Sequence, residues 1–147
     1  TDIIVGFPGE TKKDFLETAK VMKKVKFDMA YIARYSPRPG TVSARFMKDD
    51  VLSIEKKRRE KHLERILRKS ALERNQKYVG KDVEAIVHET CNPPLRRVGM
   101  KYETYFVLGK TRTFKTVKFS SDKDLTGKII KVRITKAKEF GLEGELL

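Results

Sequence analysis

The side chains best suited to covalent or metal chemistry are scarce in this sequence. It contains one cysteine, Cys91, and two histidines, His62 and His88. A thiol nucleophile needs a base beside it, and neither histidine stands in a recognisable partner motif. Cys91 precedes Asn92-Pro93-Pro94, so we expect an ordinary loop residue. We therefore predict neither a catalytic residue nor a metal ligand in the chain, and no partner for a disulfide.

Basic side chains are abundant and indicate a binding function instead. There are 34 lysines and arginines against 20 aspartates and glutamates, which gives a net charge of +14. Such an excess favours a polyanionic partner, because cationic side chains gain affinity by displacing the counterions of phosphates. The alternative is a charge that only keeps the protein in solution. The single cysteine suits a reducing compartment, and neither a signal peptide nor an apolar run of about 20 residues is present, so we expect a cytoplasmic protein without a membrane span.

Aromatic residues lie among the basic ones in one segment. Lys110, Arg112 and Lys115 are close in sequence, with Phe114 among them and Tyr105 nearby. RNA-binding surfaces combine cations for the phosphates with rings that stack on bases. We predict that the three basic residues contact RNA, with Arg112 the first choice because threonines flank it. Buried core positions are the alternative for the two rings.

Three arginines in two loops are further candidates for RNA contact. Arg96 and Arg97 follow a pair of prolines, and Arg38 lies in the turn-forming run Ser36-Pro37-Arg38-Pro39-Gly40-Thr41. The second of these loops follows a predicted strand, and ligand sites gather where the strands of an α/β sheet end. Exposure to solvent without a ligand is the alternative for Arg38.

Hydrophobic periodicity predicts a parallel crossover unit at the start of the chain. The continuous apolar run at residues 3–5 is typical of a strand buried on both faces of a parallel sheet. A turn and an amphipathic helix follow, and Thr11 with Asp14 can form a capping box at the start of that helix. The apolar stripe of the helix consists of Phe15, Ala19 and Met22. Residues 27–35 predict a second strand, parallel to the first because a helix joins the two.

Two further helices are expected, a short one around residues 42–47 and a long one over Ser53–Gln76. The apolar stripe of the long helix consists of Leu63, Ile66, Leu67 and Ala71. Its basic residues include Lys56, Lys57, Arg58, Arg59, Lys61, Arg65, Arg68 and Lys69. This basic face is either a solvated helix surface, a contact with RNA, or a docking surface for an acidic protein.

From Lys81 onward the apolar residues alternate, which predicts strands. The expected strands are residues 83–88, 102–108, 111–119, 128–137 and 142–147, with turns at Gly109-Lys110, at residues 122–127 and at Gly141. Short strands at this regular spacing indicate a small antiparallel β-barrel.

The order of these segments resembles the C-terminal part of the radical S-adenosylmethionine methylthiotransferase family. Residues 1–11 (TDIIVGFPGET) are similar to a late strand and turn of the family's barrel, and residues 35–41 (YSPRPGT) to the loop after the next strand. Residues 70–81 resemble the junction into the family's C-terminal TRAM domain. Segments 109–113, 125–128 and 132–137 resemble the strands and turns of that domain.

The resemblance implies an α/β fold followed by an all-β fold. Residues 1–52 are expected to form the last strand-helix-strand part of a partial TIM-type radical SAM barrel, and residues 53–76 a linker helix. Residues 77–147 are expected to form a small OB-like TRAM barrel that binds RNA. The sequence begins within a predicted strand, so we expect it to be a piece of a longer protein.

The resemblance also implies a function. The branch of the family that is most similar adds a methylthio group to C2 of isopentenyladenosine next to the anticodon of tRNA, which makes the tRNA anticodon stem-loop the expected partner. The branch acting on threonylcarbamoyladenosine in tRNA and a non-catalytic RNA-binding module are the alternatives. By analogy with the family, Val5, Gly6 and Tyr35 are expected near the adenosine part of S-adenosylmethionine.

Two 4Fe-4S clusters are implied for the full-length enzymes, each held by three cysteines, one set in the pattern C-x-x-x-C-x-x-C. Thiolates hold such clusters, and this chain has only Cys91. We therefore expect the chain to be inactive alone and to contribute tRNA binding and part of the S-adenosylmethionine site.

Overall fold

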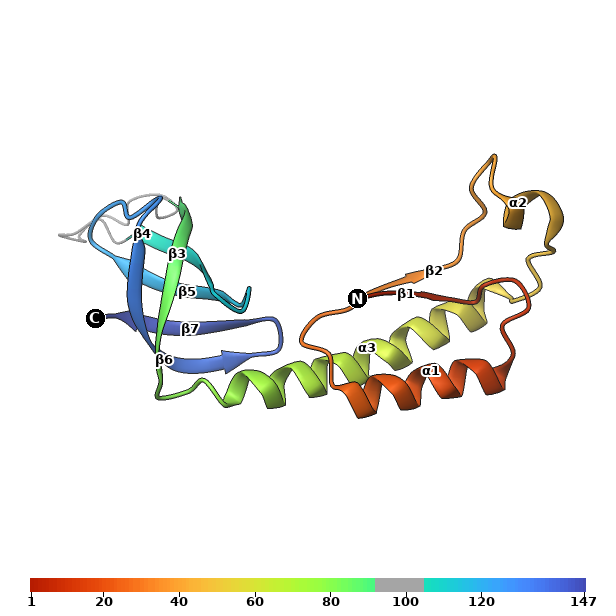
Figure 1. Cartoon of the computed structure of the whole chain (residues 1–147), viewed down its shortest axis with the longest axis horizontal. Helices are drawn as coiled ribbons and strands as arrows, with labels where there is room; N and C mark the ends of the chain where they lie inside the picture. The colour runs from red at the N-terminus through yellow and green to blue at the C-terminus, as the bar shows by residue number, and fades with distance from the viewer. Residues whose placement is uncertain (92–104) are drawn as a thin grey trace, which may run out of the picture. The chain divides into compact units, whose positions relative to one another are not determined.

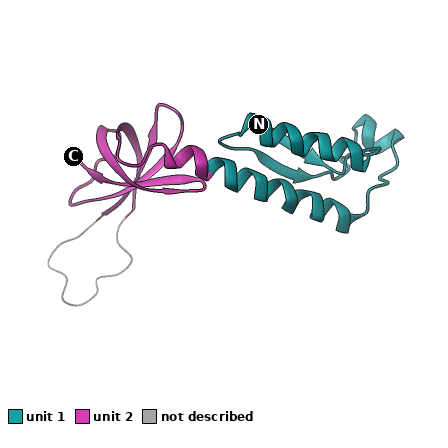
Figure 2. Ribbon diagram, turned by 90° about the horizontal axis from the view of Figure 1, so that it is seen from below, with its two compact units in different colours: residues 1–71 teal, residues 72–147 magenta. Residues whose placement is uncertain are grey.

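The computed structural model describes residues 1–91 and 105–147. They form two compact units, unit 1 (Thr1–Ala71) and unit 2 (Leu72–Leu147), coloured separately in Figure 2. One helix, α3 (Ser53–Gln76), runs through the division, so it contributes residues to both units.

Unit 1 is a two-stranded parallel sheet with α1 and α3 on one face (Figure 1). In chain order it contains β1 (Asp2–Val5), α1 (Lys12–Val25), β2 (Tyr31–Arg34), α2 (Val42–Phe46) and most of α3. β1 and β2 pair in parallel, which confirms the predicted crossover unit. The short and the long helix are also confirmed, whereas β2 is shorter than the strand predicted at residues 27–35.

A single apolar core joins the sheet of unit 1 to its two longer helices. It consists of Val5, Phe15, Ala19, Met22, Ala30, Leu63 and Leu67. The α1 stripe predicted from the sequence is buried there, and so are two members of the predicted α3 stripe. Burial of a large apolar side chain contributes about 1.5–3 kcal/mol, so this core is what holds both helices on the sheet.

The predicted capping box starts α1. The Thr11 hydroxyl oxygen accepts from the Asp14 amide at 3.2 Å, and the Thr11 amide donates to the Asp14 carboxylate at 3.0 Å. The Thr11 hydroxyl also donates to that carboxylate, and these bonds lower the pKa of Asp14. The box therefore fixes the turn that leaves β1 to the first turn of the helix.

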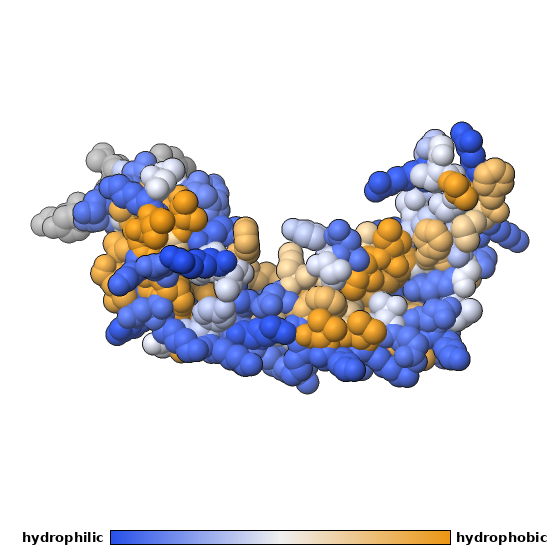
Figure 3. Space-filling model, in the orientation of Figure 1, coloured by the Kyte–Doolittle hydropathy of each residue, from blue (hydrophilic) through white to orange (hydrophobic). Residues whose placement is uncertain are grey.

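The other face of the sheet is exposed in this chain, whereas the first strand was predicted to be buried on both faces. Ile4 is 55% exposed and Tyr31 is 68% exposed. Ile4 pairs with Ala33 and Asp2 with Tyr31, so these residues share the face opposite the helices. Hydrophobic surface gathers over this sheet in Figure 3. The physical reason is that the helices of unit 1 cover one side of the sheet only.

Unit 2 is a closed five-stranded barrel with the strand order β3-β4-β5-β7-β6. The strands are β3 (Asp82–Cys91), β4 (Tyr105–Thr111), β5 (Thr116–Ser121), β6 (Ile129–Lys138) and β7 (Gly141–Leu146). The predicted barrel is confirmed, and it is consistent with a TRAM or OB-like domain. It is not wholly antiparallel as predicted, because β5 and β7 pair in parallel.

The alternation predicted for the barrel strands is present in its core. The core consists of Val87, Val107, Val117, Phe119, Leu125, Val132, Ile134 and Leu142. These side chains come from all five strands and from the turn before β6, so the interior of the barrel is filled by packed residues. In the part of the chain that the structure describes, no helix is both long and apolar enough to cross a membrane.

Two predicted turns lie inside strands instead. Gly109 and Lys110 belong to β4, and Gly141 is the first residue of β7. A Cβ atom at Gly109 would lie 3.1 Å from the Cβ of Ala85, so glycine here permits the close approach of two strands rather than a turn. The chain reverses at residues 112–115 and at 139–140.

Candidate nucleic-acid interface

The hairpin between β4 and β5 brings together the basic cluster that the sequence predicts. The hairpin lies at one end of the barrel (Figure 1). The Thr111 amide donates to the Lys115 carbonyl at 3.0 Å, which closes a loop of three residues, Arg112, Thr113 and Phe114. The Arg112 side chain is 89% exposed and Phe114 is 85% exposed. The loop therefore presents one cation and one aromatic ring to solvent.

Threonine hydroxyls hold the shape of this loop. Thr111 is buried, and its hydroxyl oxygen accepts from the Lys115 amide at 3.1 Å. The Phe114 amide donates to the Thr111 carbonyl at 2.9 Å. The Thr113 hydroxyl lies 3.1 Å from that of Thr111 and 3.2 Å from that of Tyr78. Side-chain bonds of this kind satisfy the backbone groups of the turn, so they stabilise one conformation of the loop.

The three predicted RNA-binding residues of the hairpin differ in how they are held. Lys110 Nζ donates to Thr116 Oγ1 at 2.8 Å, and Lys115 Nζ lies 5.5 Å from the centre of the Tyr78 ring. Arg112 meets Glu84 at 3.3 Å, but both side chains are largely exposed, so this ion pair is weak. Arg112 is therefore available to a stronger anionic partner.

The remaining predicted RNA contacts belong to other segments of the chain. Arg38 is exposed in the loop after β2, in unit 1. Arg96 and Arg97 lie outside the described residues. The β4–β5 hairpin thus contains three of the six predicted RNA-binding residues, and their role in RNA binding stays a prediction.

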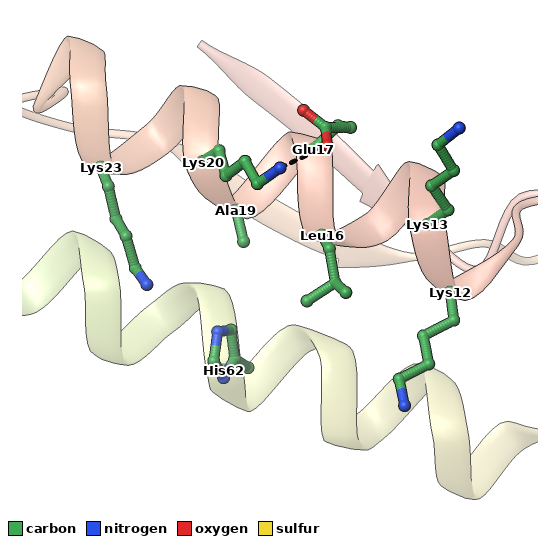
Figure 4. A pocket seen from close by; sticks show the side chains of 8 residues that line it. All are labelled: Lys12, Lys13, Leu16, Glu17, Ala19, Lys20, Lys23 and His62. Atoms are coloured by element: carbon green, nitrogen blue, oxygen red, sulfur yellow. Dashed lines mark hydrogen bonds and ion pairs between the residues drawn. The ribbon is translucent and has the colours of Figure 1, made fainter.

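A second basic surface, which the sequence analysis did not single out, lies between α1 and α3 (Figure 4). Lys12 and Lys23 extend from α1 toward α3, and His62 faces them from α3. Lys20 is paired with Glu17 at 2.6 Å. The signal in the sequence was the set of lysines flanking the α1 stripe. All the lysines of this groove are exposed, so it attracts anions only through solvent-screened charge.

The pKa of His62 in this groove is lowered from its ordinary value. Burial lowers the pKa of its imidazole, and the positive charges of Arg65, Lys23 and Arg58 lower it further. The Phe15 ring packs edge-on against the imidazole, with 5.7 Å between the ring centres. His62 therefore acts as a packing residue at the floor of the groove.

The three residues predicted to contact a cosubstrate lie together where β1 and β2 end. The Val5 carbonyl accepts from the Tyr35 amide at 2.9 Å, and Gly6 follows Val5 with a φ of 68°. The side chain of Val5 is fully buried, and Tyr35 is 9% exposed with its ring edge-on to Phe7. The Gly6 amide donates to the Glu10 carboxylate. Any ligand at this place would therefore contact the backbone and Phe7 more readily than Val5 or Tyr35.

Lys56 from the start of α3 fixes the position of this corner. Its Nζ donates to both carboxylate oxygens of Asp49, at 2.6 and 2.7 Å, and to the Tyr35 carbonyl at 3.2 Å. The ammonium group also lies over the Tyr35 ring, 5.1 Å from its centre. A Cβ atom at Gly6 would come 2.4 Å from Cγ of Lys56, so the glycine leaves room for the lysine stem. Gly6 is needed here for packing as well as for its positive φ.

Arg59, one turn later, holds the β1–α1 turn through Glu10. Arg59 Nη1 donates to the Glu10 carboxylate at 2.6 Å and to the Glu10 carbonyl at 3.0 Å. Its Nε donates to Glu55 at 3.0 Å, and Arg58 also donates to Glu55. The bond from Arg58 is the main reason that the pKa of Glu55 falls to about 2. Lys56 and Arg59 are each 5% exposed, so neither a solvated helix face nor an RNA contact describes them.

The sole thiol of the chain is held in its protonated form by a neighbouring carboxylate. Cys91 Sγ donates to Glu89 at 3.3 Å, and this bond raises the pKa of the thiol, so it is protonated at neutral pH. Among the described residues, no three or more histidine, cysteine, aspartate or glutamate side chains lie close enough to hold a metal ion.

Comparison with known proteins identifies relatives along the whole chain. No family model matches it. A "tRNA-2-methylthio-N(6)-dimethylallyladenosine synthase" of Clostridium botulinum (strain Okra / Type B1) is 41% identical over 145 residues, which cover 99% of this chain and 30% of that protein. Proteins of the same name from Bacillus thuringiensis (strain Al Hakam) and Bacillus cereus (strain AH187) are each 43% identical over 148 residues, covering 100% of this chain and 27% of theirs. The chain spans less than a third of the length of these relatives and corresponds to their C-terminal part.

Proposed function

We propose that this chain, a homologue of the C-terminal part of tRNA methylthiotransferases, supplies the tRNA-binding surface of such an enzyme. The reaction proposed for the whole enzyme is the addition of a methylthio group to C2 of isopentenyladenosine, next to the anticodon. The observation that carries the proposal is the β4–β5 hairpin, where a closed barrel exposes Arg112 with Lys110 and Lys115 beside it. The names of the relatives supply the reaction and the tRNA partner.

Unit 1 is proposed to be the last strand-helix-strand part of a partial TIM-type barrel. Its parallel strands with helices on one face support this, since barrel strands carry helices outside and packed side chains inside. The exposed apolar face with Ile4 and Tyr31 is then the inward side. In this arrangement Val5, Gly6 and Tyr35 lie at the carboxyl end of the strands, where TIM-type barrels bind their ligands. That position supports a share of an S-adenosylmethionine site.

The residues of this chain do not fit an iron-sulfur cluster. A 4Fe-4S cluster takes several thiolates, and Cys91 is a single, protonated thiol. Cluster ligands are therefore assigned to other parts of the longer enzyme, and this chain alone is expected to be inactive. We infer a cytoplasmic setting from the tRNA partner.

Two alternatives differ in what they predict. Methylthiolation of threonylcarbamoyladenosine keeps the RNA-binding surface and changes only the modified nucleoside. A non-catalytic module keeps RNA binding and loses the chemistry. The relatives named for dimethylallyladenosine favour the first proposal over both.

The test of RNA binding replaces Arg112 and Lys115 with alanine in the full chain. Loss of two phosphate contacts should weaken binding to a tRNA anticodon stem-loop about tenfold at 0.1 M salt and reduce the slope of log K against log salt by about 1.4–1.8. Filter binding over a series of salt concentrations measures both quantities. The barrel should remain folded, because exposed hairpin substitutions change stability by about 0.5 kcal/mol or less.

The matched control removes the same charge from the other basic surface. Lys13→Ala with Lys20→Ala changes the groove beside α1 and leaves the hairpin intact. We expect a clearly smaller effect on both affinity and slope. An equal loss in the two double variants would mean that only net charge matters, and an unchanged affinity in the hairpin variant would remove the hairpin from the RNA footprint.

A further inference from the structure

The third residue of the hairpin loop, Phe114, has an unusual backbone conformation. Its φ is 60°, in the left-handed region, and Lys26 is the only other described residue besides glycines with a positive φ. Three-residue hairpin loops commonly end in a left-handed residue, and glycine or asparagine is favoured there. A phenylalanine at this position costs conformational energy that either of those residues would avoid.

The ring of Phe114 contributes little to the packing of the barrel. The residue is 85% exposed, whereas the core side chains Val107, Val117 and Phe119 on the flanking strands are at most 3% exposed. An exposed ring gains nothing from the hydrophobic effect within the folded chain. The strain of the left-handed backbone at Phe114 is therefore not offset by burial of its ring within unit 2.

The immediate surroundings of the ring are cationic. Arg112 is two residues before it in the same loop and is 89% exposed, and Lys115 follows it directly. A protein partner with an apolar pocket would have to desolvate these charges, whereas RNA offers phosphates for them and a base for the ring. The charge around Phe114 thus selects RNA over an apolar protein surface.

A second exposed ring of the barrel provides a contrast. Phe106 in β4 is 39% exposed, and Lys118 Nζ lies 4.6 Å from the centre of its ring. One face of Phe106 is therefore already occupied by a cation of the same sheet. Phe114 is the ring that the barrel presents most fully to solvent among the described phenylalanines.

We propose that Phe114 stacks on an unpaired base of the bound RNA while the basic residues of the hairpin contact the phosphates on either side. This inference rests on the proposed function, because it assumes that the hairpin binds RNA. It adds a specificity-determining residue to that function: a ring that binds an unstacked base in an RNA loop and has no such partner in a continuous duplex. Phe114 belongs to the three-residue loop that joins β4 and β5, and its ring is open to solvent, so a base can reach it.

The test is Phe114→Asn in the full chain, with two RNA probes of equal length, a hairpin with an adenine-rich loop and a perfect duplex. Asparagine tolerates the left-handed backbone, so Tm of the barrel should rise by about 2–5 °C. Affinity for the looped probe should fall about tenfold, the typical loss of one stacked base. Affinity for the duplex should stay within about twofold. No charge is removed, so the salt slope should not change.

The opposite signs of the two effects exclude misfolding as the cause of weaker binding. Phe114→Tyr serves as the conservative control and should keep the affinity for the looped probe. Equal affinity of the wild type and Phe114→Asn for the looped probe would overturn the inference while leaving RNA binding in place. An equal loss on loop and duplex would also overturn it, because the ring would then contact the backbone. If the wild-type chain binds neither probe, the proposed function itself fails.

Discussion

Two basic residues of unit 1 and one of unit 2 differ sharply in burial and in partners. In unit 1, Lys56 and Arg59 of α3 are buried, paired with carboxylates and bonded to backbone carbonyls. In unit 2, Arg112 is almost fully exposed and its ion pair with Glu84 is loose. Lys56 and Arg59 therefore stabilise the interior of unit 1, whereas Arg112 is open to solvent and is proposed to contact RNA. Sequence alone gives both groups the same appearance, a run rich in lysine and arginine.

The difference follows from what each group has to neutralise. A buried cation loses its hydration, and nearby carboxylates and carbonyls must offset that loss. Removing one partner therefore lowers the free energy of unfolding. An exposed cation keeps its water until a ligand arrives, so its substitution affects binding and leaves stability nearly unchanged. Substitution of a buried cation should therefore change stability, and substitution of an exposed one should change binding. The following substitutions separate the two.

The largest expected effect is on stability, from Arg59→Met. Methionine retains the bulk of the stem but leaves the Glu10 carboxylate without its cation and removes one of the two arginines bonded to Glu55. Breaking a buried pair of this kind costs about 3 kcal/mol of the free energy of unfolding. Urea unfolding followed by circular dichroism at 222 nm reports it, because α1 and α2 lie in unit 1 and α3 begins there.

The control for this substitution is Lys57→Met, which removes the same charge from an exposed position on the same helix turn. Its stability should stay within about 0.5 kcal/mol of the wild type. RNA affinity measured while Arg59→Met is still folded should fall no further than that of Lys57→Met. A larger loss of affinity would assign Arg59 to the RNA surface after all and break the comparison between the units.

Much of the fold follows from local signals in the sequence. The capping box of Thr11 and Asp14 and the spacing of the α3 stripe depend on contacts within a few residues, so periodicity and capping chemistry predict them. The alternation of Val83, Ala85 and Val87 likewise predicts β3. The predictions that were wrong concern residues whose conformation depends on contacts distant in sequence. Gly109 is a site of close approach to Ala85, which no local pattern reveals.

The candidate site was predictable only in part for the same reason. Arg112, Lys110 and Lys115 are neighbours in sequence, so their place in one hairpin region could be predicted. The burial of Lys56 depends on Asp49 and on Tyr35 of the loop after β2, and that of Arg59 depends on Glu10, far away in the chain. The left-handed φ of Phe114 could not be predicted because phenylalanine disfavours it. Sequence patterns over a few residues therefore do not predict the burial of Lys56 and Arg59 or the backbone strain at Phe114.

A smaller effect on stability tests whether Gly6 is needed to make room for the Lys56 side chain. Gly6→Ala places a Cβ atom 2.4 Å from Cγ of Lys56 and also forces alanine to a φ of 68°. The combined clash and strain should lower the free energy of unfolding by about 2–3 kcal/mol. Gly9→Ala is the matched control. It has a φ of 83° but no described atom within 4 Å of the new Cβ, so strain alone should cost about 1 kcal/mol. Equal losses in the two variants, measured by the same urea unfolding, would show that Lys56 is free to move aside.

The smallest expected effect is the pH dependence of the stabilisation by Glu55. It tests whether the ion pairs of Glu55 with Arg58 and Arg59 stabilise the fold. The bond from Arg58, with that from Arg59, lowers the pKa of Glu55 from 4.5 to about 2 in the folded chain. A carboxyl whose folded pKa is lowered stabilises the fold above its unfolded pKa and loses that contribution as the pH falls from about 4.5 toward 2. Glu55 is partly exposed, so solvent screening reduces the contribution to about 1 kcal/mol. Glu55→Gln should therefore be less stable than the wild type by about this amount at pH 6, and the gap should shrink to about half by pH 3. A gap that is the same at both pH values would mean that Glu55 acts through its shape and not its charge, and the electrostatic account of these ion pairs would lose its support.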